Sequence, residues 1–229
     1  PAGTGNRCAM LSRGYVEILG KTSDTPLARQ LEERLKRHVG LHLAAFSTAD
    51  AAAERERLAA AGFAVPPLVD MRRPVATAAG SEDARFTIAR IAEGAMPEGR
   101  MQFLAHHTPH LVWREGYLDH PNGARALLGA WIAAADPAEA ALRFARFTGR
   151  QARREHGRMT ISLDRGNLFF ATPDFLHIEF GIMPGPPNPH LAAYEVGADS
   201  LPSAGRPIER GIAVTLPPAL GGTILFRAP

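Results

Sequence analysis

The side chains best suited to chemistry gather where one apolar run ends. His106, His107, His110 and Trp113 lie within eight residues, directly after the apolar run at residues 100–105. Imidazoles can bind a metal or transfer a proton near neutral pH, and an indole can form an apolar wall. Their position after a predicted strand indicates a candidate site for metal binding or proton transfer.

A carboxylate in an otherwise apolar strand is the second candidate. Residues 7–11 and 15–19 read as two strands joined by a tight turn, which predicts a β-hairpin. Tyr15, Glu17 and Leu19 share one face of the second strand, because side chains alternate along a strand. Glu17 is therefore either exposed to solvent or held by a metal or another cation.

Simpler interpretations stand beside these two. The segment at residues 106–109 can be a turn whose side chains cap backbone groups. Pro109 argues against a helical zinc pair of His106 and His110, and the chain contains no His-Glu-x-x-His motif. Trp113 can equally be a core residue. No Ser-His-Asp or Cys-His arrangement is favoured.

The composition excludes several classes of protein. The chain has 229 residues, 45% of them hydrophobic, and a net charge of +3. No apolar run approaches the roughly 20 residues that a membrane helix needs. Cys8 is the single cysteine, so no internal disulfide can form; we expect a small core residue and a cytoplasmic protein. The basic run at residues 150–154 lacks interleaved aromatic residues, so we expect no nucleic-acid partner.

Strand and helix signals recur in one order. Helices are predicted at residues 25–38, 48–61 and 138–147, and strands at residues 41–47, 84–91, 100–105, 127–135, 158–163, 167–172, 189–196, 211–216 and 222–227, with a broken extended piece at 63–69. Residues 41–106 give the order β-α-β-β-β, the order recurs from residue 127, and a weaker copy starts at residue 189 with a helix stub at 200–205. The sequence therefore predicts an α+β protein of tandem β-α-β-β-β units.

Measured against this repeat, the chain begins inside a unit. The hairpin at residues 7–19 matches the last two strands of a copy, so the first unit is N-terminally truncated. By analogy with the other units, we expect about fifty further residues before Pro1 in the native protein. We expect two halves, residues 1–123 with a partial and a complete unit, and residues 124–229.

Several segments resemble the glyoxalase-like branch of the vicinal oxygen chelate superfamily, which includes glyoxalase I, bleomycin-resistance proteins and extradiol dioxygenases. The segments are Gly3-Thr4-Gly5-Asn6-Arg7 followed by Tyr15-Val16-Glu17-Ile18-Leu19, His106-His107-Thr108-Pro109 with Leu111-Val112-Trp113, His120-Pro121-Asn122-Gly123, and the strand leading into Ala135-Asp136-Pro137. The resemblance spans most of the chain. It implies units that curl open mixed sheets into a U-shaped cup around a divalent metal.

The resemblance also implies a set of metal ligands. Glu17 lies on the last strand of the truncated unit, and His42 lies on the first strand of the next. The last-strand glutamate of that unit would fall near Phe103 or Leu104, neither of which can ligate, so His106 would take its place. Phe226 occupies the corresponding position in the last unit, so the second half is expected to hold no metal.

The implied metal is Zn²⁺, Mn²⁺, Fe²⁺ or Ni²⁺, which can hold two adjacent substrate oxygens and stabilise negative charge. The implied function is that of a metal-dependent lyase, isomerase or dioxygenase acting on a small oxygenated metabolite. Glu17 and His107 would be catalytic, and Arg7, Arg100 and Trp113 would contact the substrate. The alternative is a non-catalytic protein that sequesters a small ligand, as bleomycin-resistance proteins do. We also expect a small-molecule substrate or ligand, no association with a membrane, and a homodimer.

Overall fold

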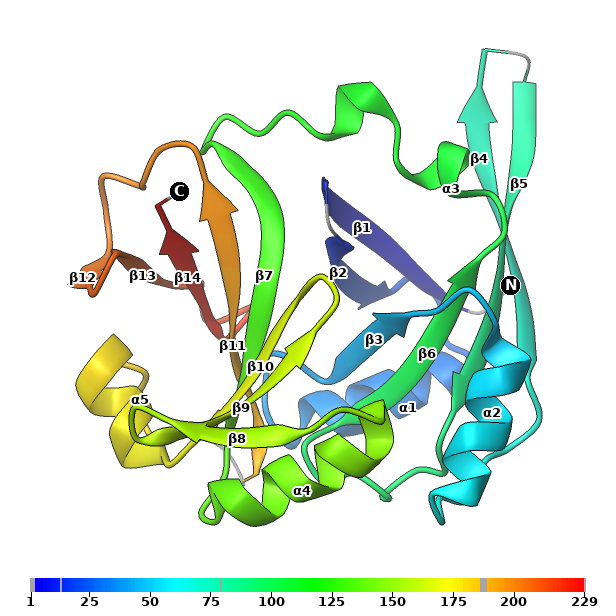
Figure 1. Cartoon of the computed structure of the whole chain (residues 1–229). Coiled ribbons are helices and arrows are strands. Elements are labelled where there is room, and N and C mark those ends of the chain that lie inside the picture. Colours follow the sequence, from blue (N-terminus) through cyan, green and yellow to red (C-terminus); the bar gives the residue numbers. More distant parts are fainter. Residues whose placement is uncertain (1–2, 13, 79, 186–188, 229) are drawn as a thin grey trace. The chain divides into compact units, whose positions relative to one another are not determined.

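A computed structural model describes residues 3–12, 14–78, 80–185 and 189–228 (Figure 1). The chain separates into two compact units, here called unit 1 (Pro1–His42 with Glu115–Pro229) and unit 2 (Leu43–Arg114). The predicted α+β class with mixed sheets is confirmed. The predicted halves at residues 1–123 and 124–229 follow the repeats rather than these compact units, and that division stays a prediction.

Unit 2 has the predicted β-α-β-β-β order. Its elements are β3 (Leu43–Ser47), α2 (Ala51–Ala60), β4 (Val69–Thr77), β5 (Gly80–Arg90), β6 (Arg100–His106) and the short helix α3 (Pro109–Val112). The sheet order is β3-β6-β5-β4, with β3 parallel to β6 and the other pairs antiparallel. The first and last strands of the unit are therefore neighbours, and the long β4–β5 pair forms the opposite edge (Figure 1).

Local signals set the ends of α2 and the two faces of this sheet. The Asp50 carboxylate accepts hydrogen bonds from the backbone N–H groups of Ala52 and Ala53, which satisfies two donors at the helix start. Phe103 lies on the helix-bearing face, where the Arg57 guanidinium stands 5.3 Å from its ring centre. The adjacent Leu104 lies on the other face, in a buried apolar cluster that also contains α3.

Unit 1 contains a two-stranded sheet and an eight-stranded sheet. Its elements are β1 (Thr4–Leu11), β2 (Gly14–Lys21), α1 (Pro26–Leu35), the 3₁₀ turn η1 (Glu115–Tyr117), β7 (Ala124–Ala133), α4 (Pro137–Thr148), β8 (Ala152–Glu155), β9 (Arg158–Leu163), β10 (Gly166–Ala171), α5 (Pro173–Phe180), β11 (His190–Ala198), β12 (Arg206–Ile208), β13 (Gly211–Thr215) and β14 (Thr223–Arg227). The large sheet has the order β12-β13-β14-β11-β7-β10-β9-β8.

This order consists of two further copies of the unit 2 pattern. In each copy the first strand lies parallel to the last, and the remaining strands follow antiparallel. The two first strands, β7 and β11, pair antiparallel and join the copies into one sheet. The internal repeat predicted from the sequence is therefore present three times in the described residues, and the β1–β2 hairpin has the antiparallel pairing of the last two strands of a copy.

Several local expectations were wrong. The residues at 200–205 form bends and irregular backbone rather than a helix stub, and strand β1 begins at Thr4 rather than at residue 7. The sequence did not predict β4, β8, β12 or α5 as separate elements. Strands β4, β8 and β12 carry charged residues at exposed positions, and α5 is only eight residues long, so their sequence signals are weak. Cys8, expected in the core, is exposed.

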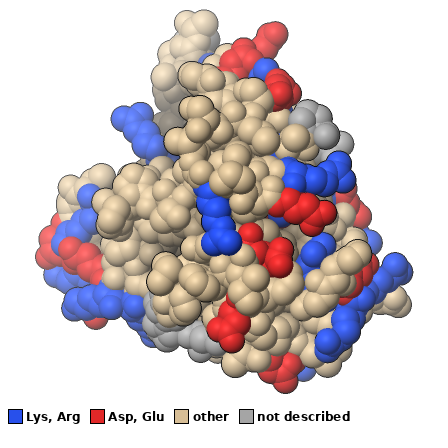
Figure 2. Space-filling model, turned by 90° about the vertical axis from the view of Figure 1, so that its left-hand side faces the viewer, with Lys and Arg blue, Asp and Glu red and all other residues tan. Residues whose placement is uncertain are grey.

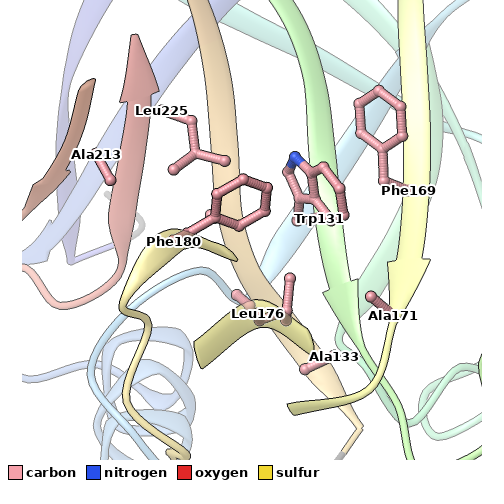
Figure 3. Close-up of a cluster of buried hydrophobic side chains, with 10 residues drawn as sticks. Trp131, Ala133, Phe169, Ala171, Leu176, Phe180, Ala213 and Leu225 are labelled. Carbon is pink, nitrogen blue, oxygen red and sulfur yellow. The ribbon is translucent and has the colours of Figure 1, made fainter. Parts of the chain in front are cut away.

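Aromatic side chains form the main core of unit 1 (Figure 3). The Trp131 ring stacks on Phe169 at 4.6 Å between ring centres, and Phe180 of α5 meets it edge-on at 4.7 Å. On the opposite face of the sheet, Phe144 of α4 packs edge-on against Phe170 at 5.0 Å, and both are fully buried. Helices thus cover both faces of this part of the sheet.

One buried ion pair lies in this core. The Glu195 carboxylate, 7% exposed, accepts hydrogen bonds from Trp131 Nε1 at 3.0 Å and from Arg227 Nε and Nη2 at 3.0 and 2.6 Å. Arg227 also donates through Nη1 to the Glu209 carbonyl at 2.7 Å. A buried charge needs such partners, because leaving it unpaired is costly.

On the face shown in Figure 2, positive and negative side chains are interspersed among uncharged residues, and neither sign forms a continuous patch. Of the helices in the described ranges, none combines the length and the apolar character that crossing a bilayer demands.

Candidate functional site

The β1–β2 hairpin presents Glu17 in an ordered, exposed position. Glu17 is exposed, which is one of the two alternatives left open by the sequence. The Asn6 side-chain amide donates to Glu17 Oε1 at 2.5 Å, and Cys8 lies directly opposite Glu17 on β1. Arg7 pairs with Ile18 and so projects from the other face of the hairpin. The structure therefore brings together Glu17, Asn6 and Cys8, but not Arg7.

The charge of Glu17 acts on its neighbours. Desolvation, and then the negative charge of Glu17, raise the pKa of the Cys8 thiol to about 11. The same two causes, in the same order, raise the pKa of the Tyr15 phenol well above its usual range. Both groups therefore stay protonated near neutral pH.

His42 lies in a group of three histidines within unit 1. Its ring stacks on His38 at 4.0 Å, and its Nε2 donates to the His38 carbonyl at 2.9 Å. The His38 ring lies 6.1 Å from His190, which is 8% exposed. Burial, followed by the neighbouring His38, lowers the pKa of both His42 and His190. These imidazoles are therefore neutral near pH 7.

His106 and Trp113 meet on the apolar face of unit 2. Their ring centres are 4.8 Å apart in an edge-on arrangement, and Phe86 lies 5.3 Å from the histidine on the same face. Arg100 begins the same strand, and six residues of extended chain separate it from His106 by about 20 Å. The structure thus brings Trp113, but not Arg100, next to His106.

His107 projects from the opposite face to His106. Its Nε2 lies 2.8 Å from the Thr87 hydroxyl, which lies 2.7 Å from Asp70 Oδ1. Asp70 and Thr87 are directly opposed on β4 and β5, on the face that carries α2. His107 and His106 are therefore separated by the thickness of the sheet, so they cannot share one ligand site on either face.

A polar hollow lies at the projecting end of the β4–β5 pair. It has a volume of about 430 Å³ and is lined by Arg72, Glu82, Asp83, Arg85, Thr108, His110 and Leu111. Thr108 is fixed here because its Oγ1 accepts a hydrogen bond from the Arg85 backbone N–H at 2.8 Å. His110, the last of the three histidines at residues 106–110, thus lines the hollow.

The described residues do not complete a metal site. In the ranges that the structure describes, no three His, Cys, Asp or Glu side chains are grouped so as to hold an ion. Of the predicted ligands, Glu17 and His42 belong to unit 1 and His106 to unit 2. His42 Nε2 is already engaged by a carbonyl, which leaves Nδ1 as its one lone pair when the ring is neutral.

Sequence reasoning missed three polar side chains that hold the candidate residues. Asn6 lies just before the strand predicted at residues 7–11, and a hairpin extended by one more pair would have placed it beside Glu17. Asp70 and Thr87 lie on strands whose mutual register no periodicity in the sequence gives. Once this register is known, Asp70 and Thr87 can be recognised as a polar pair on adjacent strands.

Comparisons with known proteins agree with this fold. Residues 1–148 match the family described as the glyoxalase-like domain. A hypothetical protein from Staphylococcus aureus has a similar structure, with a TM-score of 0.73 and 11% identity over 99% of this chain and 86% of that one. A mutant of 4-hydroxymandelate synthase from Streptomyces coelicolor has a TM-score of 0.50 and 13% identity over 86% of this chain and 60% of that one.

At such identities the two structures show a shared fold alone. No curated protein matches the chain. The family match covers well over half of the sequence and includes the hairpin with Glu17, all of unit 2 and helix α4. On this match, and on the repeated β-α-β-β-β units, the chain belongs to the glyoxalase-like domain family of the vicinal oxygen chelate superfamily.

Proposed function

We propose that the protein is an enzyme acting on a small oxygenated metabolite, as a lyase, isomerase or dioxygenase. Membership of the superfamily supports the reaction classes and the small substrate. The observation that carries the proposal is the Glu17 carboxylate, which is exposed to solvent and yet ordered by Asn6. We propose the exposed hairpin face around Glu17 as the reacting part of the site.

Glu17 has the properties of a general base. In the described part of the chain it forms no ion pair, so its charge is not compensated by a neighbouring cation. The neutral amide of Asn6 fixes one oxygen, Oε1, and leaves Oε2 for a ligand. Such a carboxylate can take a proton from a carbon next to a carbonyl, if the substrate places that proton within hydrogen-bond reach.

The divalent metal implied by the superfamily remains part of the proposal, with Glu17, His42 and His106 as its ligands, and Glu17 acts as the base when it is not a permanent ligand. When bound, it would polarise two neighbouring substrate oxygens. Because the described residues do not by themselves form a three-ligand group, the role of Glu17 as a base is argued without it. We also propose a cytoplasmic homodimer, for which the single cysteine and the exposed apolar Ile18 and Leu19 are the support.

The test compares Glu17→Gln with a matched control, Glu155→Gln. Glu155 is an exposed strand residue far along the chain from the hairpin. Turnover is measured on vicinal dicarbonyl, hydroxy-acid and catechol substrates, and metal content is measured by elemental analysis after incubation with Zn²⁺, Mn²⁺, Ni²⁺ or anaerobic Fe²⁺. We expect Glu17→Gln to lose about 10²–10⁴ in kcat, the usual contribution of a general base, and the control to lose nothing. Unchanged turnover in Glu17→Gln would overturn this role.

A non-catalytic binding protein is the second candidate. It is favoured by the absence, in the described ranges, of a three-ligand group. This candidate predicts that the protein binds an apolar or drug-like ligand without turnover and without dependence on added metal. Intrinsic fluorescence measures this binding. Equal binding by the Glu17→Gln variant would support it, whereas metal-dependent turnover would exclude it.

A further inference from the structure

A chain of hydrogen bonds fixes the ring of His107. The Thr87 hydroxyl lies 2.7 Å from Asp70 Oδ1 and 2.8 Å from His107 Nε2. An ionised carboxylate can only accept, so the one hydroxyl proton of Thr87 goes to Asp70. His107 must then donate its Nε2–H to the Thr87 oxygen, and a neutral ring carries its lone pair on Nδ1.

This arrangement gives His107 an acceptor for a ligand. The residue is exposed at the end of β6, and no hydrogen bond within the described ranges engages its Nδ1. Two residues that do not touch the ligand, Asp70 and Thr87, hold the ring in one orientation and one tautomer. A histidine prepared in this way accepts a hydrogen bond from an O–H or N–H group of a small molecule.

Positive charge lies directly beside this acceptor. Arg85 is opposite His107 in the sheet, since the His107 backbone N–H donates to the Arg85 carbonyl at 2.9 Å. Arg72 is opposite Arg85 on the next strand. Arg72 is 4.0 Å from Asp83, whereas Arg85 has no ion-pair partner among the described residues. Across the sheet, His107 is therefore followed by Arg85, which has no ion-pair partner among the described residues, and then by Arg72, which is paired with Asp83.

The adjoining hollow limits the size and charge of a ligand. Its volume of about 430 Å³ lies in the range of small-molecule sites. Glu82 and Asp83 line it together with the two arginines, so a polyanion would meet repulsion there. Arg85 lines the hollow, and His107 lies outside this lining but directly opposite Arg85 in the sheet, so a ligand with one negative group and one hydroxyl can pair with Arg85 and reach the histidine acceptor.

We propose that this face of unit 2 is a second small-molecule site, which binds a hydroxycarboxylate. The carboxylate pairs with Arg85, the hydroxyl donates to His107 Nδ1, and Asp70 and Thr87 are positioning residues that act through His107. The residues of this site belong to unit 2, whereas Glu17, the base proposed above, belongs to unit 1. The test of this site therefore does not depend on the proposed reaction.

The test measures binding to the full chain at pH 8 by NMR. The probes are glycolate, 3-hydroxypropionate and 4-hydroxybutyrate, each compared with the acid that lacks the hydroxyl. We expect one hydroxy acid to bind roughly 2–10-fold more tightly than its matched acid, which is the net worth of one hydrogen bond. This ratio should fall to about one in His107→Gln and in Thr87→Val, and Thr87→Ser should restore it.

Two further measurements separate positioning from mere stability. Ring ¹⁵N shifts should show the Nε2–H tautomer of His107 in the wild type and a mixture in Thr87→Val. Arg85→Gln should weaken both members of a probe pair alike, and Arg73→Gln, on the same strand as Arg72 but the other face, should weaken neither. Absence of binding, equal binding of paired probes, or an Nδ1–H tautomer in the wild type would overturn the proposal.

Discussion

The Glu17 carboxylate on β2 raises the pKa of two neighbouring side chains, Cys8 and Tyr15. Its only described hydrogen-bond donor is a neutral amide, so its full charge acts on the thiol and the phenol beside it. Reactivity of the thiol therefore reports on this carboxylate without any knowledge of the substrate.

We predict that Cys8 is unreactive towards alkylation near neutral pH in spite of its exposure. With a pKa of about 11, the thiolate at pH 8 is on the order of one molecule in a thousand. Glu17→Gln removes the second cause of the raised pKa, so alkylation by iodoacetamide should accelerate severalfold. Mass spectrometry against time and pH measures the rate, and Glu32→Gln on α1 is the control. A rate that Glu17→Gln leaves unchanged would contradict the assigned electrostatics.

The sequence could predict part of the residue-level arrangement. Alternation along a strand correctly placed Glu17 with Tyr15, and proximity in sequence correctly linked His106 with Trp113. The same alternation separates His106 from His107, but a strand had to be followed to its last residue to see this. Contacts between strands, such as Thr87 with His107, depend on register and could not be read from one strand alone.

Among the elements, the strongly periodic ones were predictable. Helices α1, α2 and α4 each have a capping side chain directly before their first residue, supplied by Thr25, Asp50 and Asp136. Strand β8 was not predictable, because Ala152–Glu155 is short and carries three charged residues, as edge strands do. Tertiary pairing with β9 makes it a strand.

The ion pair that links β11 to β14 gives a prediction at the scale of elements. Arg227→Met would leave the buried Glu195 with Trp131 as its remaining described donor. An uncompensated buried charge costs about 3–5 kcal/mol, so the free energy of unfolding should fall by that amount. Urea denaturation measures it, and the double variant Arg227→Met with Glu195→Gln should recover most of the loss. A single variant as stable as wild type would show that the pair is not structural.

At the scale of the whole molecule, His42 and His190 predict how stability depends on pH. The folded state lowers the pKa of His42 and His190 from 6.5, chiefly by burial, so it binds fewer protons than the unfolded chain. The electrostatic effects of His38, Arg34 and Arg37 on His42 lower its pKa as well. Stability from this source is complete above about pH 6.5 and is lost as the pH falls below it.

Thermal unfolding between pH 8 and pH 5 tests this dependence. His190→Asn should flatten the fall in Tm between pH 6.5 and 5, because one of the two groups that must bind a proton is gone. His177→Gln is the control, since His177 is exposed on α5. A Tm that is constant over this range in the wild type would contradict the burial argument.

The antiparallel pairing of β7 with β11 has a consequence for the origin of the large sheet. Two copies of one motif that meet through the same strand in opposite directions are related by a local two-fold axis, as the subunits of an isologous dimer are. In the C-terminal part of the chain, the β7–β11 pairing is thus the kind of contact that two separate subunits would make, but here the two copies belong to one chain. Tethering the copies makes their association independent of protein concentration, although the two copies differ: the copy that begins with β7 has helix α4, and in the copy that begins with β11 no helix lies between β11 and β12.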